Sequence, residues 1–102
     1  MAMVHKFNVM KPDDAEWEEM EIPIHDSFIF PNLERFKAVD TFWGSCDKKT
    51  SKGLDYCGYT YIPPESMDAL LNAVKGVEGL EELEKLALFA KEKNARIEHI
   101  GL

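Results

Sequence analysis

Three histidines and two cysteines are the residues of this chain best suited to chemistry. His5 and His99 fall in the first and last segments that we expect to be strands, and these two strands could be neighbours. Cys57 with His99 would then form a thiol–imidazole pair, the arrangement of a nucleophilic catalyst. No sequence signature surrounds either residue, and this number of cysteines and histidines gives many accidental pairs. We therefore predict that the chain has no catalytic residue and is not an enzyme.

The spacing of potential ligands argues against a metal site or a phosphate-binding loop. His25-Asp26 is a dipeptide rather than a ligand spacing, and no His-x-x-x-His or Cys/His cluster occurs. The polar run 44–53 lacks the Gly-Lys-Ser/Thr ending of a phosphate-binding loop. We interpret it as an exposed hairpin loop, whose lysines are Lys48, Lys49 and Lys52. We expect neither a metal nor a cofactor.

The negative charge is concentrated in one segment. The chain has 19 acidic and 12 basic residues, for a formal net charge of -7. No Lys or Arg occurs from 12 to 34, whereas the rest of the chain is close to neutral. Clustered carboxylates raise the rate of encounter with a basic protein, and aromatic side chains can anchor the contact. We predict a partner-binding set within this segment: Asp13, Asp14, Glu16, Trp17, Glu18, Glu19, Glu21, Asp26, Phe28 and Phe30. The alternative is a solvated acidic segment whose apolar residues turn into the core.

Two kinds of hydrophobic spacing predict the elements that position these residues. Alternating, aromatic and β-branched residues predict strands over 4–10, 35–43, 56–62 and 96–100. Helical spacing predicts one helix over 67–74, after a pair of prolines, and a second one that stops at Asn94. We therefore expect a single domain, 1–102, of the α+β class. It should have a mainly antiparallel sheet of four to five strands with two C-terminal helices packed on it.

Composition narrows the class of protein further. Apolar residues make up 45% of the chain, which argues against intrinsic disorder. No apolar run reaches the ~18–20 residues needed to span a bilayer, and no signal peptide is recognisable. An acidic chain is also a poor general binder of nucleic acid. We expect a cytoplasmic protein in which Cys46 and Cys57 are reduced thiols.

The C-terminal part of the chain carries a resemblance to a known group of proteins. Its pattern is Tyr-Ile-Pro-Pro-Glu-Ser at 61–66, Leu70-Leu71, an apolar and charged helix over 83–93, and Ile-Glu-His-Ile-Gly at 97–101. This pattern resembles small immunity proteins of bacterial polymorphic-toxin systems, including those of contact-dependent growth inhibition. The resemblance implies a cytoplasmic, non-enzymatic protein that binds one toxin domain and blocks it.

The expected function combines this resemblance with the charge. We expect a cytosolic immunity protein that neutralises a basic toxin domain, with nuclease as the expected toxin activity. The alternative is an adaptor, or an anti-defence protein that mimics nucleic acid. A further alternative is a small enzyme or ligand-binding domain that uses Cys57, His99 and the tyrosines Tyr56, Tyr59 and Tyr61.

Overall fold

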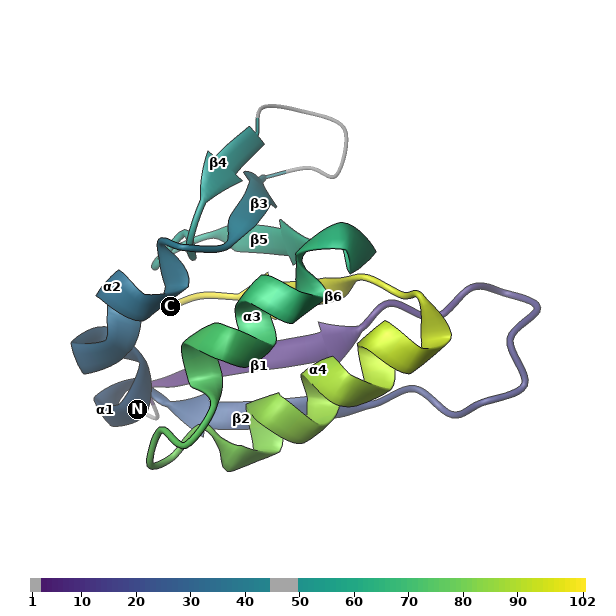
Figure 1. Ribbon diagram of the computed structural model, residues 1–102, viewed down its shortest axis with the longest axis horizontal. Helices are drawn as coiled ribbons and strands as arrows, with labels where there is room; N and C mark the ends of the chain where they lie inside the picture. The colour runs from purple at the N-terminus through teal and green to yellow at the C-terminus, as the bar shows by residue number, and fades with distance from the viewer. Residues whose placement is uncertain (1–2, 45–49) are drawn as a thin grey trace.

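The computed structural model describes residues 3–44 and 50–102, which form one six-stranded antiparallel sheet with helices on one face (Figure 1). The strands are β1 (Val4–Val9), β2 (Glu21–His25), β3 (Asp40–Trp43), β4 (Thr50–Lys52), β5 (Tyr59–Ile62) and β6 (Ile97–Ile100). The helices are α1 (Asp26–Ile29), α2 (Leu33–Phe36), α3 (Met67–Val74) and α4 (Glu81–Lys93), with short 3-10 turns η1 (Phe30–Asn32) and η2 (Pro64–Ser66). Cys46, Lys48 and Lys49 lie outside the described residues.

The first and last strands of the described chain pair with each other in the interior of the sheet. Its strand order is β2-β1-β6-β5-β3-β4, so the first strand pairs with the last. In the register, His99 lies opposite Phe7 on one side and opposite Thr60 on the other. This confirms that the strands of His5 and His99 are neighbours.

The core lies between the sheet and the helices. Alternation along β1 turns His5, Phe7 and Val9 to the inner face, where each is fully buried. α3 and α4 cover this face, α4 with the buried stripe that includes Leu83 and Leu86. α4 ends at Asn94, whose left-handed φ of 52° terminates the helix.

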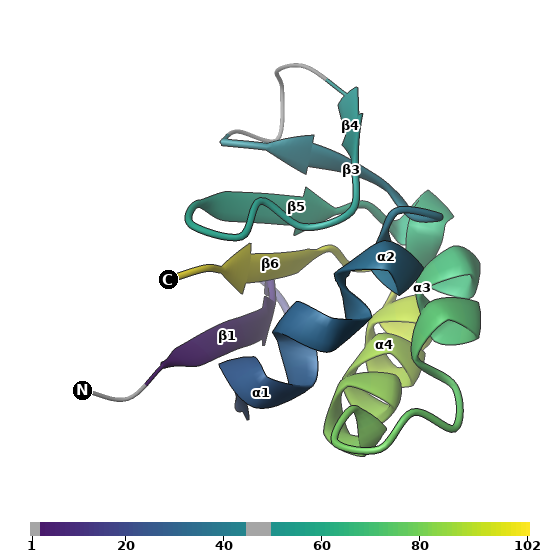
Figure 2. The same cartoon turned by 90° about the vertical axis from the view of Figure 1, so that its left-hand side faces the viewer.

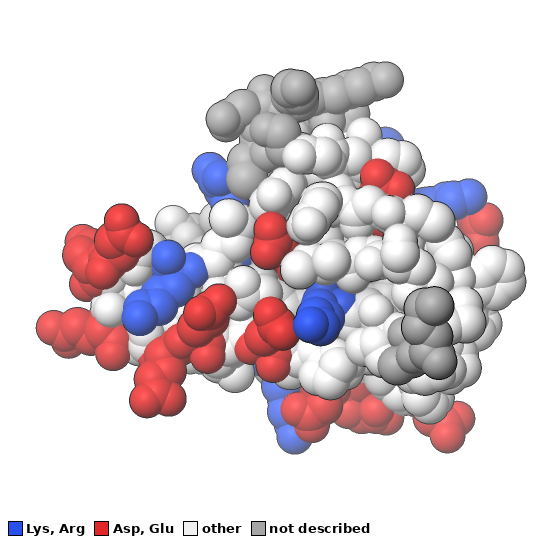
Figure 3. Space-filling model, turned by 180° about the vertical axis from the view of Figure 1, so that it is seen from behind, with Lys and Arg blue, Asp and Glu red and all other residues white. Residues whose placement is uncertain are grey.

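The other face of the sheet has no helix over it in the described part of the chain (Figure 2). A row of side chains crosses this open face, since Asn8 lies opposite Glu98, Glu98 opposite Tyr61, and Tyr61 opposite Phe42. Seen from behind, a broad uncharged area lies to one side of the middle of the molecule, a few charged side chains lie in the middle itself, and acidic groups gather at one end (Figure 3).

The predicted strand number is wrong, because the sheet has six strands and not four to five. The additional strands, β2 and β4, form the two edges. β2 contains Pro23, which cannot donate a ladder hydrogen bond and is therefore tolerated on an edge. β4 falls within 44–53, where a loop was expected. The α+β class and the two C-terminal helices agree with the prediction.

The expected strand over 35–43 is also partly wrong. Its first residues belong to α2, and β3 begins only at Asp40. Phe36 and Val39 are buried together because a turn follows the helix, with the Val39 N–H donating to Phe36 O over 2.9 Å. Their spacing of three residues is therefore helical rather than alternating.

Candidate functional site

Six exposed carboxylates lie on the segment that joins β1 to β2 and on the first residue of β2, and we call them the acidic surface: Asp13, Asp14, Glu16, Glu18, Glu19 and Glu21. The segment projects beyond the sheet at the right of Figure 1, and its charges lie at the left of Figure 3. None of the six forms an ion pair with any described residue. Their charge is therefore not neutralised by the described part of the fold.

The acidic surface is held in place by its own apolar residues. The Trp17 indole meets the Phe89 ring of α4 edge-on, with ring centroids 5.2 Å apart. At the base of the segment, the Val9 N–H donates to Met20 O over 2.9 Å. Trp17 and Met20 pack against the core, so the indole is committed to anchoring the segment rather than free for a partner.

A cavity of about 370 Å³ opens beside the acidic surface. Asp13 and Glu19 line it from the segment, Asn8 and Glu98 line it from the sheet, and Lys11 adds one positive charge to its wall. The Asn8 Oδ1 is buried and has no hydrogen-bond partner in the described chain. Because three carboxylates outnumber the one lysine in its wall, and an orphan acceptor lies beside them, the cavity is complementary to a group with N–H donors and a positive charge.

A buried chain of polar side chains occupies the opposite end of the sheet. His5 Nε2 lies 2.9 Å from Asp26 Oδ1, and His5 Nδ1 lies 2.8 Å from His99 Nε2. His99 Nδ1 lies 3.3 Å from Thr60 Oγ1, which accepts from the Asp55 N–H over 2.8 Å. Both imidazole rings are 0% exposed.

The protonation states of these linked side chains have two causes. Burial determines that of His99, and hydrogen bonding determines that of Asp26. Burial, aided by the neighbouring His5, lowers the pKa of His99 to about 3, so this ring is neutral. Hydrogen bonds from His5 and Tyr56 lower the pKa of Asp26 despite its partial burial. The same Asp26 carboxylate raises the pKa of Tyr56 to about 12. An ionised carboxylate and a neutral imidazole therefore share one buried chain.

These contacts separate the two members of the suspected catalytic pair. Cys57 is exposed, whereas His99 is completely buried and both its ring nitrogens have partners. His99 is therefore not placed to meet a substrate. The polar side chains Asp26, His5, His99 and Thr60 instead link α1 to the neighbouring strands β1, β6 and β5. Sequence reasoning foresaw only that the strands of the two histidines could be neighbours.

The structure does not bring the whole predicted partner-binding set together. Asp26, Phe28 and Phe30 lie on α1 and η1, at the end of the sheet opposite the acidic surface (Figure 1). The Asp26 side chain is 13% exposed and bonded to His5. Phe30 is 63% exposed and meets the ring of Tyr56, with centroids 5.9 Å apart. A partner centred on the acidic surface therefore does not use these aromatics as its anchors.

The remaining observations on the described residues concern a membrane-spanning helix and a metal site. In the described ranges, 3–44 and 50–102, no helix is both long enough and apolar enough to traverse a bilayer. Over the same ranges, no three His, Cys, Asp or Glu side chains gather as a metal site would require.

Comparison of the chain with protein-family models, with curated proteins and with solved structures found no match.

Proposed function

We propose that this protein is a cytoplasmic immunity protein that binds a basic toxin domain through the acidic surface and so blocks the toxin, the expected toxin activity being that of a nuclease. The single observation that carries the proposal is the acidic surface itself. Its six carboxylates are exposed and have no ion pair with described residues, yet an aromatic anchor holds their segment on α4.

Retaining so much unpaired charge is unfavourable for folding alone, because like charges repel one another. A positively charged partner reverses the sign of this interaction and is steered toward the segment before contact. Nuclease active sites are basic because they bind phosphates. An acidic protein that occupies such a site therefore competes directly with the substrate.

The cavity beside the acidic surface indicates how the contact is made specific. An arginine or lysine of the partner can enter it, donate to Asn8 Oδ1 and pair with the carboxylates of Asp13, Glu19 and Glu98. Burying a cation among fixed acceptors slows dissociation, whereas the exposed rim of carboxylates mainly speeds association.

The resemblance over 61–101 to immunity proteins of bacterial polymorphic-toxin systems agrees with this proposal and supplies its biological setting. In these systems the immunity protein acts without turnover, which is consistent with the burial of His99 away from substrate. A toxin encoded beside this chain would be the partner.

The test begins by capturing partners from an extract of the native host with the purified chain. A captured toxin domain should lose its nuclease activity when the chain is added. The triple variant Asp14→Lys, Glu16→Lys, Glu18→Lys should associate about 10-fold more slowly and with a flatter salt dependence. Its fold should persist, because exposed charges contribute about 0.5 kcal/mol each or less.

A matched control carries the same charge change elsewhere on the surface. The variant Glu78→Lys, Glu82→Lys, Glu92→Lys alters exposed carboxylates in or near α4 and should keep more of the association rate. Asn8→Leu should leave association nearly unchanged and raise the dissociation rate. Equal loss in both triple variants would indicate only a net-charge effect, and an unchanged rate in the first triple variant would refute the proposed contact.

A further inference from the structure

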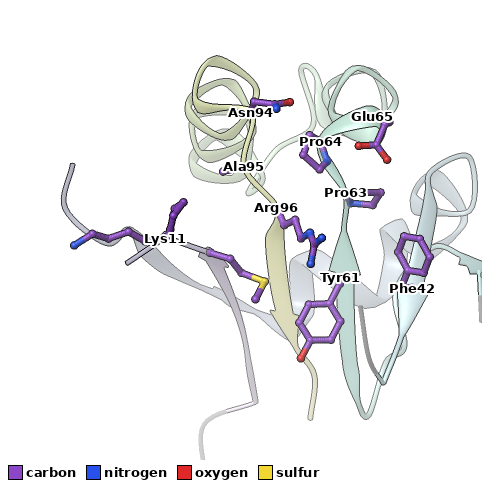
Figure 4. A pocket seen from close by; sticks show the side chains of 11 residues that line it. Lys11, Phe42, Tyr61, Pro63, Pro64, Glu65, Asn94, Ala95 and Arg96 are labelled. Carbon is purple, nitrogen blue, oxygen red and sulfur yellow. The ribbon is translucent and has the colours of Figure 1, made fainter. Parts of the chain in front are cut away.

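A cavity of about 500 Å³ adjoins the cavity beside the acidic surface, and residues 10–12 line both. It opens on the uncovered face of the sheet, where β1 and β5 end and β6 begins (Figure 4). Its volume is in the range of pockets that hold small molecules.

Two cations line this cavity, although the chain as a whole is acidic. Arg96 and Lys11 are both exposed, and neither has an ion pair with a described residue. Arg96 precedes the buried Ile97 and therefore points to the open face. In Figure 4 its side chain extends from β6 toward Tyr61 on β5. A guanidinium in this position offers paired N–H donors to a carboxylate or phosphate.

Side chains with rings form much of the remaining wall. Tyr61 and Phe42 lie opposite each other on adjacent strands, and Pro63 and Pro64 continue the wall above them. Such side chains present flat, apolar surface on which a planar ring can stack. Among the described lining residues Glu65 is the one carboxylate, and it lies on the wall beside Pro64. It disfavours a second negative group there, so the ligand carries its charge at the end near Arg96.

We propose that this cavity binds a small planar ring compound with one anionic group, a carboxylate or a phosphate, held by Arg96 and Lys11 while the ring lies against Tyr61 and Phe42. This site differs in its chemistry from the proposed contact with a basic partner, although Met10, Lys11 and Pro12 line both cavities. It uses cations where that contact uses carboxylates, and it does not depend on the existence of a toxin.

The test measures binding of phenyl phosphate, inorganic phosphate and benzyl alcohol by isothermal titration and by amide NMR shifts. Phenyl phosphate should bind with a Kd of about 1 mM, as expected for a ligand of its size. It should bind at least about 10-fold more tightly than either probe that offers the anion or the ring alone. The shifted amides should lie near 10–12, 61–65 and 94–96.

Two variants test separately which residue binds the anionic group of the ligand and which residue contacts its ring. Arg96→Gln should weaken phenyl phosphate about 10-fold or more, whereas the matched control Arg35→Gln, on α2 at the other end of the sheet, should leave its Kd unchanged. Tyr61→Leu should reduce the preference for phenyl phosphate over inorganic phosphate. The amide spectrum of each variant checks its fold.

Four results would overturn the proposal: no binding of phenyl phosphate at about 10 mM, equal binding of phenyl and inorganic phosphate, equal losses in the Arg96 and Arg35 variants, or amide shifts centred away from 94–96. Equal binding would mean that the cations attract anions without a ring site. A shift pattern centred away from 94–96 would place the binding elsewhere. Loss of the toxin contact in the acidic-surface variants would not alter any of these outcomes.

Discussion

Lowering the pH from 7 to 5 should destabilise the fold through His99. Burial lowers the pKa of this ring from its ordinary 6.5 to about 3, so an unfolded chain takes up a proton that the folded chain excludes. Because the folded pKa is the lower one, the stabilising contribution is present above 6.5 and is lost as the pH falls from there toward 3.

The expected size follows from these two pKa values. At pH 5 the imidazole is almost entirely protonated in the unfolded chain and neutral in the folded one. The free energy of unfolding should therefore be lower by about 2 kcal/mol than at pH 7. Asp26 does not contribute in this window. Its pKa is lowered, mainly by the hydrogen bond from His5, so its contribution is lost only below its ordinary value of 3.8.

Urea unfolding at about pH 7, 6 and 5 measures this effect, with a constant slope m showing that the transition stays two-state. His99→Gln should remove most of the decrease, whereas His25→Gln, at an exposed ring, should retain it. If the His99→Gln variant does not fold, NMR of the wild-type protein tests the same reasoning. The signals of the His99 ring should remain those of a neutral imidazole at pH 5. A His99 signal that titrates near pH 6, or an unfolding free energy that is constant from pH 7 to 5, would refute the reasoning.

Three further predictions concern local structure. Gly79→Ala should lower stability by about 1–3 kcal/mol in thermal or urea unfolding, since Gly79 has φ of +87° and an added Cβ would overlap the Phe28 ring; an unchanged midpoint would contradict it. Asn94→Ala should cost about 1 kcal/mol, because Asn94 ends α4 in the left-handed region, whereas Asn94→Gly should cost nothing. Cys57 is exposed and free, so mass spectrometry should find it alkylated by iodoacetamide in the native protein; protection until unfolding would show that the thiol is covered.

Elements with strong periodicity could be predicted from the sequence. α3 and α4 follow from apolar residues at helical spacing, and β1, β5 and β6 follow from alternating or β-branched runs. The two edge strands could not be recognised in this way. β2 mixes an exposed glutamate with Pro23, and β4 is a short polar strand that exists only because β3 pairs with it.

The candidate sites likewise differ in how far they could be predicted: residues close in sequence could be grouped, and residues brought together only by the fold could not. The acidic surface could be predicted because its charged residues lie close together in the sequence. The buried chain could not, because Asp26, His5, His99 and Thr60 come from four separate segments and meet only through the sheet register. Phe28 and Phe30 are close in sequence to the acidic surface, yet β2 carries the backbone to the opposite end of the sheet before they occur.

The central position of β6 determines when the sheet can be completed during synthesis. β6 is the last of the six strands to be made, yet it is the only link between the pair β2-β1 and the trio β5-β3-β4 in the described sheet. Until residues 97–100 have left the ribosome, the nascent chain holds two separate strand groups with unpaired central edges. Such edges are prone to pair with other chains, and closing contacts across so long a stretch of sequence is slow. A ribosome that stalls just before β6 therefore presents an incomplete sheet, to which chaperones rather than partners would be expected to bind.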